Sequence, residues 1–182
     1  MIYMFLADGF EETEALVTLD MLRRAGIEIK TAGVGSVTPR GAHAITVTAD
    51  MPAEQISFDS LSGIILPGGM PGTENLYADD SVIRALDYCV ANGLLVAAIC
   101  AAPIIPGRKG YLSGKKAVCY PGFENELQGA DLSDGVCVTD GNIITAKGAG
   151  CVFEFSYDII SYLLDDEKAI KVIKEIQHKG LT

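Results

Sequence analysis

The sequence predicts an α/β fold: a doubly wound sandwich whose central sheet is mostly parallel and has helices on both faces. Three observations lead to this prediction. Short apolar runs alternate along the chain with amphipathic helical stretches. The runs lack the polar alternation of half-exposed strands, as expected for parallel strands that are buried on both sides. Glycines follow several of these runs, as they do at the ligand-facing edge of such a sheet.

The chain opens with a β-α-β unit. A first apolar run ends at Asp8-Gly9, and a helical stripe of apolar residues follows, with glutamates in its first turn. Arg23-Arg24 and Gly26 end this helix in the expected way. A second strand comes next, and then two short stretches that predict a small β excursion. The elements expected here are strands at 2–7, 27–32, 38–40 and 45–48 and a helix at 11–25.

The middle of the chain contains a glycine-rich loop between a buried strand and a helix. The loop at 67–72 reads Pro-Gly-Gly-Met-Pro-Gly and lacks the lysine and the spacing of a phosphate-binding loop. We interpret this loop as part of the ligand-facing edge of the sheet. The alternative is an ordinary turn without a role in binding. A helix capped by Asp79 or Asp80 ends at Asn92-Gly93. The elements expected in this part are strands at 63–66 and 94–99 and a helix at 81–90.

The last third of the chain predicts a short helix after residue 103, a hairpin and two helices. Proline and three glycines between 106 and 116 keep the first of these helices short. Asp140-Gly141-Asn142 has the turn chemistry of a hairpin. The elements expected are strands at 117–120, 136–139 and 143–146, a helical turn at 124–127, and helices at 152–164 and 168–177.

Composition limits both the architecture and the function. A chain of 182 residues with 49% hydrophobic residues predicts one domain over residues 1–182. The net charge of −10 disfavours binding to nucleic acid or to an anionic membrane surface. No signal peptide or membrane-spanning stretch is visible, so we expect a soluble, cytoplasmic protein. Five cysteines without a C-x-x-C pair and two isolated histidines, His43 and His178, predict reduced thiols and no metal site or cofactor.

Cys100 is the candidate nucleophile. The charge-free run 94–99 delivers this cysteine into a row of alanines that ends at Pro103, which predicts a sharp strand-to-helix turn, a nucleophile elbow. A helix N-terminus facing the thiol would lower its pKa from about 8.5 toward neutrality. The alternative is a buried structural cysteine, because free cysteines are among the most buried residues.

Three loops are expected to form one pocket around this thiol. The loops lie at 8–14, 67–72 and 100–103, each directly after a predicted strand. The carboxyl ends of parallel strands meet at one edge of a sheet. Glu14 would exchange a proton with Cys100, and backbone N–H groups of Gly69 and Ala101 would hold an oxyanion. The alternative role for the glutamates at 11, 12 and 14 is helix capping, at about 0.3 to 1 kcal/mol each.

Four motifs in order carry a family resemblance. They are Ala-Asp-Gly-Phe-Glu-Glu-Thr-Glu at 7–14, Leu-Pro-Gly-Gly at 66–69, Ala-Ala-Ile-Cys-Ala-Ala-Pro at 97–103 and Gly-Ala-Gly-Cys-Val-Phe-Glu-Phe at 148–155. With them the chain resembles the ThiJ/PfpI family, also called the DJ-one superfamily. The resemblance covers nearly the whole chain and is closer to the ThiJ and DJ-one branch than to the PfpI peptidase branch.

The resemblance implies a flavodoxin-like sandwich and a homodimer. It also implies that Cys100 is the nucleophilic or oxidisable cysteine, that Glu14 is its protonated carboxyl partner, and that Gly69 and Ala101 supply backbone donors. Tyr120 stands where many relatives have a histidine. His43 stands where some relatives have an arginine that reaches toward the partner's site, so His43 is expected to approach Cys100 across the dimer interface.

Three functions follow from these residues and the resemblance. The first is a cofactor-independent enzyme of the glyoxalase or deglycase kind, acting on reactive carbonyls such as methylglyoxal or on the thiols and amines they modify. The second is a redox-sensing or chaperone-like stress protein whose Cys100 is oxidised. A cysteine peptidase or amidase ranks third, because no histidine of the matching pattern accompanies Cys100.

Overall fold

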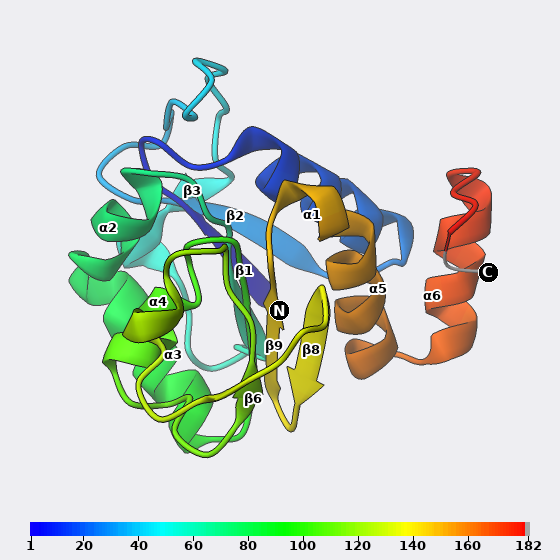
Figure 1. Ribbon diagram of the computed structural model, residues 1–182. Helices are drawn as coiled ribbons and strands as arrows, with labels where there is room; N and C mark the ends of the chain where they lie inside the picture. Colours follow the sequence, from blue (N-terminus) through cyan, green and yellow to red (C-terminus); the bar gives the residue numbers. More distant parts are fainter. Residues whose placement is uncertain (181–182) are drawn as a thin grey trace.

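A twisted, mostly parallel sheet forms the centre of the molecule. The computed structural model describes residues 1–180, and its main sheet has seven strands in the order β3-β2-β1-β4-β5-β9-β8 (Figure 1). All neighbours run parallel except β8 and β9, which form the predicted hairpin. The strands are β1 (Ile2–Leu6), β2 (Ile29–Gly33), β3 (Met51–Pro52), β4 (Gly63–Leu66), β5 (Leu95–Ile99), β8 (Cys137–Asp140) and β9 (Ile143–Ala146).

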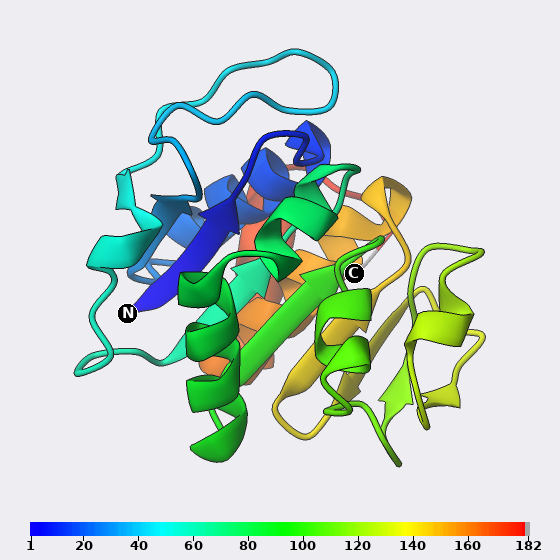
Figure 2. The same cartoon turned by 90° about the vertical axis from the view of Figure 1, so that its left-hand side faces the viewer.

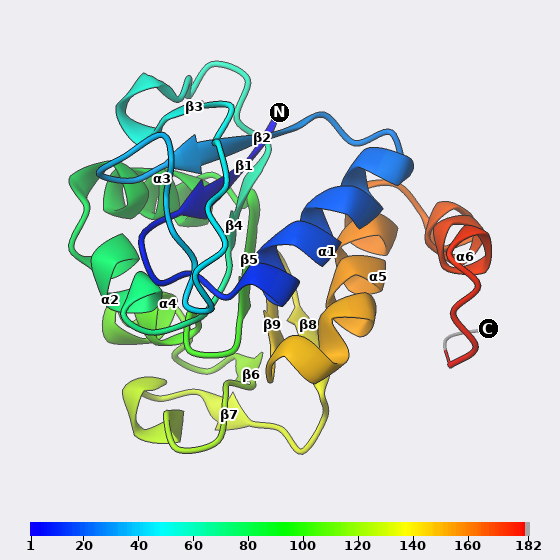
Figure 3. The same ribbon diagram turned by 90° about the horizontal axis from the view of Figure 1, so that it is seen from above.

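Helices cover both faces of this sheet, so the predicted flavodoxin-like α/β fold is confirmed. Figure 3 shows α1 and α5 on one face with α6 outside α5, and α2, α3 and α4 on the other face. Three 3₁₀ turns, η1 (Ala53–Gln55), η2 (Glu124–Glu126) and η3 (Ala149–Cys151), lie in the connections. The helices are α1 (Glu12–Arg24), α2 (Gly72–Tyr77), α3 (Asp80–Ala91), α4 (Ile104–Arg108), α5 (Val152–Leu163) and α6 (Asp166–Glu175).

Strand β5 lies at the centre because both of its faces are apolar. All five of its residues are buried, and its side chains alternate between the two hydrophobic clusters that flank the sheet. Its register is set by β4 on one side and β9 on the other, with Val96 opposite Ile64 and Ile143. Burying a side chain such as Val96 contributes about 1.5 to 3 kcal/mol. The end of β5 is therefore a rigid support for the residue that follows it.

Two segments differ from the predicted strands. The stretches at 38–40 and 45–48 form only one antiparallel bridge, between Arg40 and Thr46, within a segment that projects from the sheet (Figure 2). Backbone hydrogen bonds join the two stretches, from the N–H groups of Gly41, Val47 and Ala49 to the carbonyls of Ile45, Pro39 and Val37, so the predicted excursion is an irregular hairpin rather than a pair of regular strands. The strand expected at 117–120 is shortened to β6 (Lys116–Ala117), which pairs with β7 (Asp131–Leu132) outside the main sheet.

No helix within residues 1–180 combines the length and the apolar character that crossing a membrane requires.

Candidate active site

Cys100 lies directly after β5, in a backbone conformation that exposes its side chain. Its φ angle of 65° is in the left-handed region, which non-glycine residues seldom occupy. Two backbone hydrogen bonds hold it there: the Cys100 N–H donates to the Ala146 carbonyl at 2.9 Å, and the Tyr120 N–H donates to the Cys100 carbonyl at 2.8 Å. The strained turn predicted from the small residues at 101 and 102 is therefore present, and the adjacent loops hold it in place.

Glu14 reaches the same place from the first turn of α1. Its side chain is only 1% exposed, and its Oε2 accepts the Gly68 N–H at 2.8 Å. Among residues 1–180, Oε1 has no hydrogen-bond partner that meets ordinary geometric limits. Glu11 caps the helix by accepting the Glu14 N–H at 2.7 Å, as the capping alternative predicted for one of these glutamates. A buried carboxyl with one free oxygen is suited to proton exchange.

Gly68 lies in close contact with both the Glu14 carboxyl and the Cys100 side chain. A Cβ at this position would lie 2.5 Å from Cys100 Cβ and 2.8 Å from Glu14 Oε2. Both approaches are shorter than real Cβ contacts, so a side chain here would push the two reactive groups away. Glycine is required at 68 by this close approach, a role that the sequence motif did not reveal.

Gly69 and Ala101 direct their backbone N–H groups at the Cys100 sulfur, and both groups lower the pKa of the thiol. Gly69 has a φ of +89°, and a Cβ there would lie 2.5 Å from the backbone of Glu11 and Gly9. Glycine therefore lets this loop turn close to the start of α1. The structure brings together all four residues predicted for the site on one chain: Cys100, Glu14, Gly69 and Ala101.

The pKa of Glu14 agrees with the prediction in direction, whereas the pKa of Cys100 does not. Burial raises the pKa of Glu14 to about 7, in the direction expected for a carboxyl that holds a proton. Burial and the charge of Glu14 together raise the pKa of Cys100 to about 12, so the predicted lowering of the thiol pKa is wrong. Burial is the largest cause, and the N–H groups of Gly69 and Ala101 offset it only in part.

His43 lies on Glu12 rather than on Cys100 of its own chain. Glu12, which is 4% exposed, accepts the backbone N–H of His43 at 2.7 Å and of Ile45 at 3.3 Å. The His43 Nδ1 lies 2.9 Å from Glu12 Oε2, and this contact raises the pKa of the imidazole. Glu11, Glu12 and His43 offer three potential metal ligands within 4.8 Å of one another. Glu12 already uses its oxygens to anchor the loop, so we assign this cluster a structural role.

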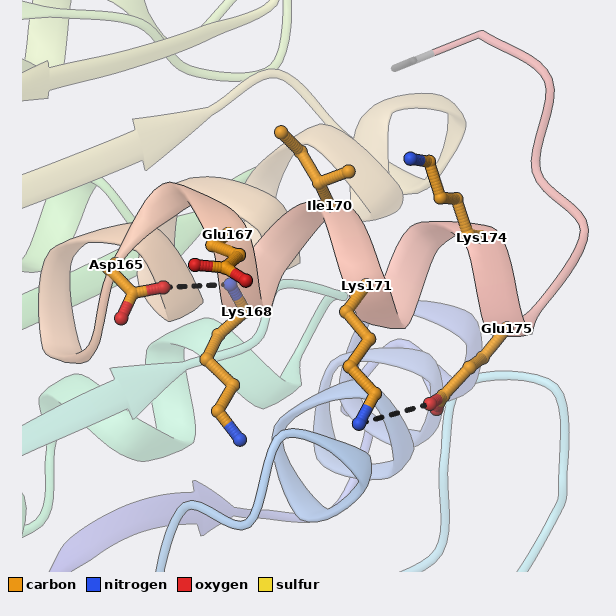
Figure 4. Close-up of a pocket in the computed structure, with 7 residues that line it drawn as sticks. All are labelled: Asp165, Glu167, Lys168, Ile170, Lys171, Lys174 and Glu175. Atoms are coloured by element: carbon orange, nitrogen blue, oxygen red, sulfur yellow. Dashed lines mark hydrogen bonds and ion pairs between the residues drawn. The ribbon is translucent and has the colours of Figure 1, made fainter.

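The remaining cysteines and His178 lie outside the site. Burial raises the pKa of Cys89 to about 12 and of Cys119 to about 11, and neither thiol is paired with a buried carboxyl as Cys100 is with Glu14. His178 stacks on Phe153 with ring centroids 4.8 Å apart. Figure 4 shows a hollow on α6 that contains a Lys171–Glu175 pair at 3.9 Å but no nucleophile. Cys100 therefore remains the candidate for chemistry with a thiol.

Comparison with known proteins identifies the family to which this chain belongs. The model of the DJ-1/PfpI family matches residues 1–162, a span that includes the thiol, the carboxyl and both donor loops. The chain belongs to the DJ-1/PfpI family. Protein dj-1beta of Drosophila melanogaster is 34% identical over 93% of this chain and 92% of its own. A cysteine-to-alanine mutant of a DJ-1 superfamily protein from Salmonella typhimurium superposes with a TM-score of 0.93 at 33% identity, covering 98% of both chains.

Other family members indicate the branch. Oxidized DJ-1 of Toxoplasma gondii has a TM-score of 0.93 at 31% identity over 97% of both chains. A deglycase of Pyrococcus abyssi is 27% identical over 86% of this chain and 95% of its own. A glutathione-independent glyoxalase of Caenorhabditis elegans is 30% identical over 91% of this chain and 89% of its own. These names place the chain in the DJ-1/ThiJ branch, as the motifs predicted.

Proposed function

We propose that the protein is a cofactor-independent enzyme that converts small reactive carbonyls, such as methylglyoxal, into hydroxy acids. The observation that carries this proposal is the pairing of the Cys100 thiol with the buried carboxyl of Glu14, beside the N–H groups of Gly69 and Ala101. The chain's similarity to a deglycase and a glyoxalase supports an enzymatic role. The same chemistry would release carbonyl adducts from modified thiols and amines.

The reaction begins with addition of the Cys100 sulfur to the aldehyde carbon. As the sulfur–carbon bond forms, the thiol proton moves to Glu14, whose free Oε1 can accept it. The former aldehyde oxygen, held by the N–H groups of Gly69 and Ala101, takes up a proton to give a hemithioacetal. In this step Glu14 acts first as base and then as acid, which reconciles a raised thiol pKa with a nucleophilic role.

The second half moves one proton between carbons and consumes one water. Glu14 removes the hydrogen of the former aldehyde carbon as a proton and returns it to the neighbouring carbonyl carbon. The proton of the hemithioacetal hydroxyl moves to the oxygen of that neighbouring carbon, which becomes the new hydroxyl, while the former aldehyde oxygen becomes a carbonyl oxygen. This leaves a thioester on Cys100. Water adds to the thioester, the sulfur–carbon bond breaks, the proton returns to sulfur and the hydroxy acid leaves. The net change is carbonyl plus water to hydroxy acid, without an external oxidant or reductant.

Methylglyoxal turnover tests this function. Purified protein should form lactate from methylglyoxal without glutathione, and Cys100→Ala and Glu14→Gln should each abolish the activity. Cys137→Ala is the matched control, because Cys137 is a half-buried thiol that takes no part in the site. Lactate formation that survives Cys100→Ala would contradict the proposal.

A second candidate is redox sensing at the same thiol. The N–H groups of Gly69 and Ala101 and the carboxyl of Glu14 would also hold the oxygens of a sulfinate on Cys100. Mass spectrometry after mild peroxide treatment tests this idea. Preferential oxidation of Cys100 without carbonyl turnover favours sensing, whereas equal oxidation of all five cysteines argues against it.

We further propose that the protein acts as a homodimer in which the partner subunit's His43 lies near this site. The support is that the His43 side chain is 71% exposed on the projecting segment, where a second chain can reach it. Sedimentation should give a dimer mass. His43→Ala should change the activity of the dimer only if the imidazole lies near the substrate.

A further inference from the structure

The order of the strands decides what flanks the Cys100 thiol. In the sheet, β5 lies between β4 and β9, so the turn at Cys100 lies between the loops that follow those two strands. The loop after β4 carries Gly69 and Met70, and the loop after β9 carries Gly148. These two loops therefore flank the turn that carries the sulfur.

Tyr120 forms the wall on the β9 side. Its backbone N–H holds the Cys100 carbonyl at 2.8 Å, and its ring lies over Gly148, where a Cβ would be 3.3 Å from Tyr120 Cδ2. The side chain is nevertheless 50% exposed, and Phe123 supports it edge-on with ring centroids 6.5 Å apart. The ring is held by these neighbours, and half of the side chain remains exposed on a residue whose backbone is hydrogen-bonded to Cys100.

Met70 directly follows the donor Gly69 and is 45% exposed, but it lines a hollow with Pro71 and residues of the segment 40–44. The Tyr120 ring therefore remains the flat apolar surface next to the turn at Cys100, and such a ring favours stacking with a flat partner.

We propose that Tyr120 selects carbonyl substrates that carry a flat apolar substituent, such as an aromatic α-oxoaldehyde. This inference rests on the proposed function and specifies its substrate class. The aldehyde carbon lies at the Cys100 sulfur, its oxygen lies at the N–H groups of Gly69 and Ala101, and the substituent extends along the Tyr120 ring. Methylglyoxal has only a methyl group for this surface and gains little from it.

Steady-state kinetics with two substrates test the selection. For the wild type, kcat/KM for phenylglyoxal should exceed that for methylglyoxal by about three- to tenfold, the range that aromatic contacts provide. Tyr120→Ala should remove this preference, and Tyr120→Phe should retain it because the ring remains. Tyr88→Ala is the control, since Tyr88 is an exposed aromatic residue that packs on Phe58, away from the site. An equal loss for both substrates in Tyr120→Ala would overturn the proposal.

Alkylation of Cys100 separates this inference from the proposed function. The rates with iodoacetamide and N-phenyl iodoacetamide are measured by mass spectrometry and normalised to the rates with glutathione. Tyr120→Ala should lower the normalised phenyl preference about three- to tenfold, and Tyr120→Phe should not. A protein that turns over neither carbonyl but shows this change lacks the proposed activity yet retains the selection. An unchanged ratio refutes the role of Tyr120 whatever the activity.

Discussion

Replacing Glu14 by glutamine should make the protein more stable at alkaline pH, although the substitution removes a residue of the site. Burial raises the pKa of Glu14 from 4.5 to about 7. A raised carboxyl pKa means that the folded state binds the proton more tightly than the unfolded state, so stability falls as pH rises through this window. The full cost of the charged carboxyl is about 3.4 kcal/mol, at about 1.36 kcal/mol for each pH unit.

The size of the effect depends on pH in a defined way. At about pH 5.5 the cost is about 1.4 kcal/mol, and at about pH 8 it is about 3.3 kcal/mol, because most of the window has then been crossed. The free energy of unfolding of Glu14→Gln, relative to the wild type, should therefore increase by about 2 kcal/mol between these two conditions. Any loss of packing or hydrogen bonding in the variant is the same at both pH values and cancels in this difference.

Urea unfolding of both proteins at the two pH values measures this quantity. Glu28→Gln serves as the control, since it removes one carboxyl charge from an exposed position. The Glu14→Gln difference should grow with pH and the Glu28→Gln difference should not. A Glu14→Gln difference that is constant between the two conditions would show that Glu14 is charged in the folded protein throughout, and would refute the proposed proton exchange.

Four further outcomes are expected. Alkylation of Cys100 by iodoacetamide should rise through about pH 7 in the wild type, as Glu14 becomes able to accept the thiol proton, and this inflection should be absent from Glu14→Gln. Gly68→Ala should cost about 1 to 3 kcal/mol in urea unfolding and abolish activity, whereas Gly150→Ala, with open space for its Cβ, should do neither. Cys100→Gly should be about 1 kcal/mol more stable than Cys100→Ala, since glycine adopts a φ of 65° without strain; equal stabilities would argue against strain at this turn. Arg108→Met, which leaves two carboxylates on α2 and η2 without their shared guanidinium, should lower the free energy of unfolding by about 1 to 3 kcal/mol, and an unchanged midpoint would contradict this.

Much of the fold could be predicted because the central strands are uniform in character. Run 94–99 is apolar on both sides, which only a strand between two helical layers satisfies, and the structure places it there as β5. The pairing of the stretches at 38–40 and 45–48 could not be predicted, because alternation over four residues does not reveal whether a partner strand is available. There the chain forms an irregular hairpin with one bridge, and Glu12 anchors its tip.

The sequence by itself determined the family and most of the helices and strands, and it predicted the thiol and the carboxyl of the candidate site, because these depend on residue types at short spacing. Only the tertiary structure decided how the two groups share a proton. The pKa values of Cys100 and Glu14 depend on burial and on the distance between residues far apart in the chain, which no local pattern encodes. The same holds for Gly68 and Tyr120, whose roles arise from contacts between loops that the sheet order brings together at Cys100.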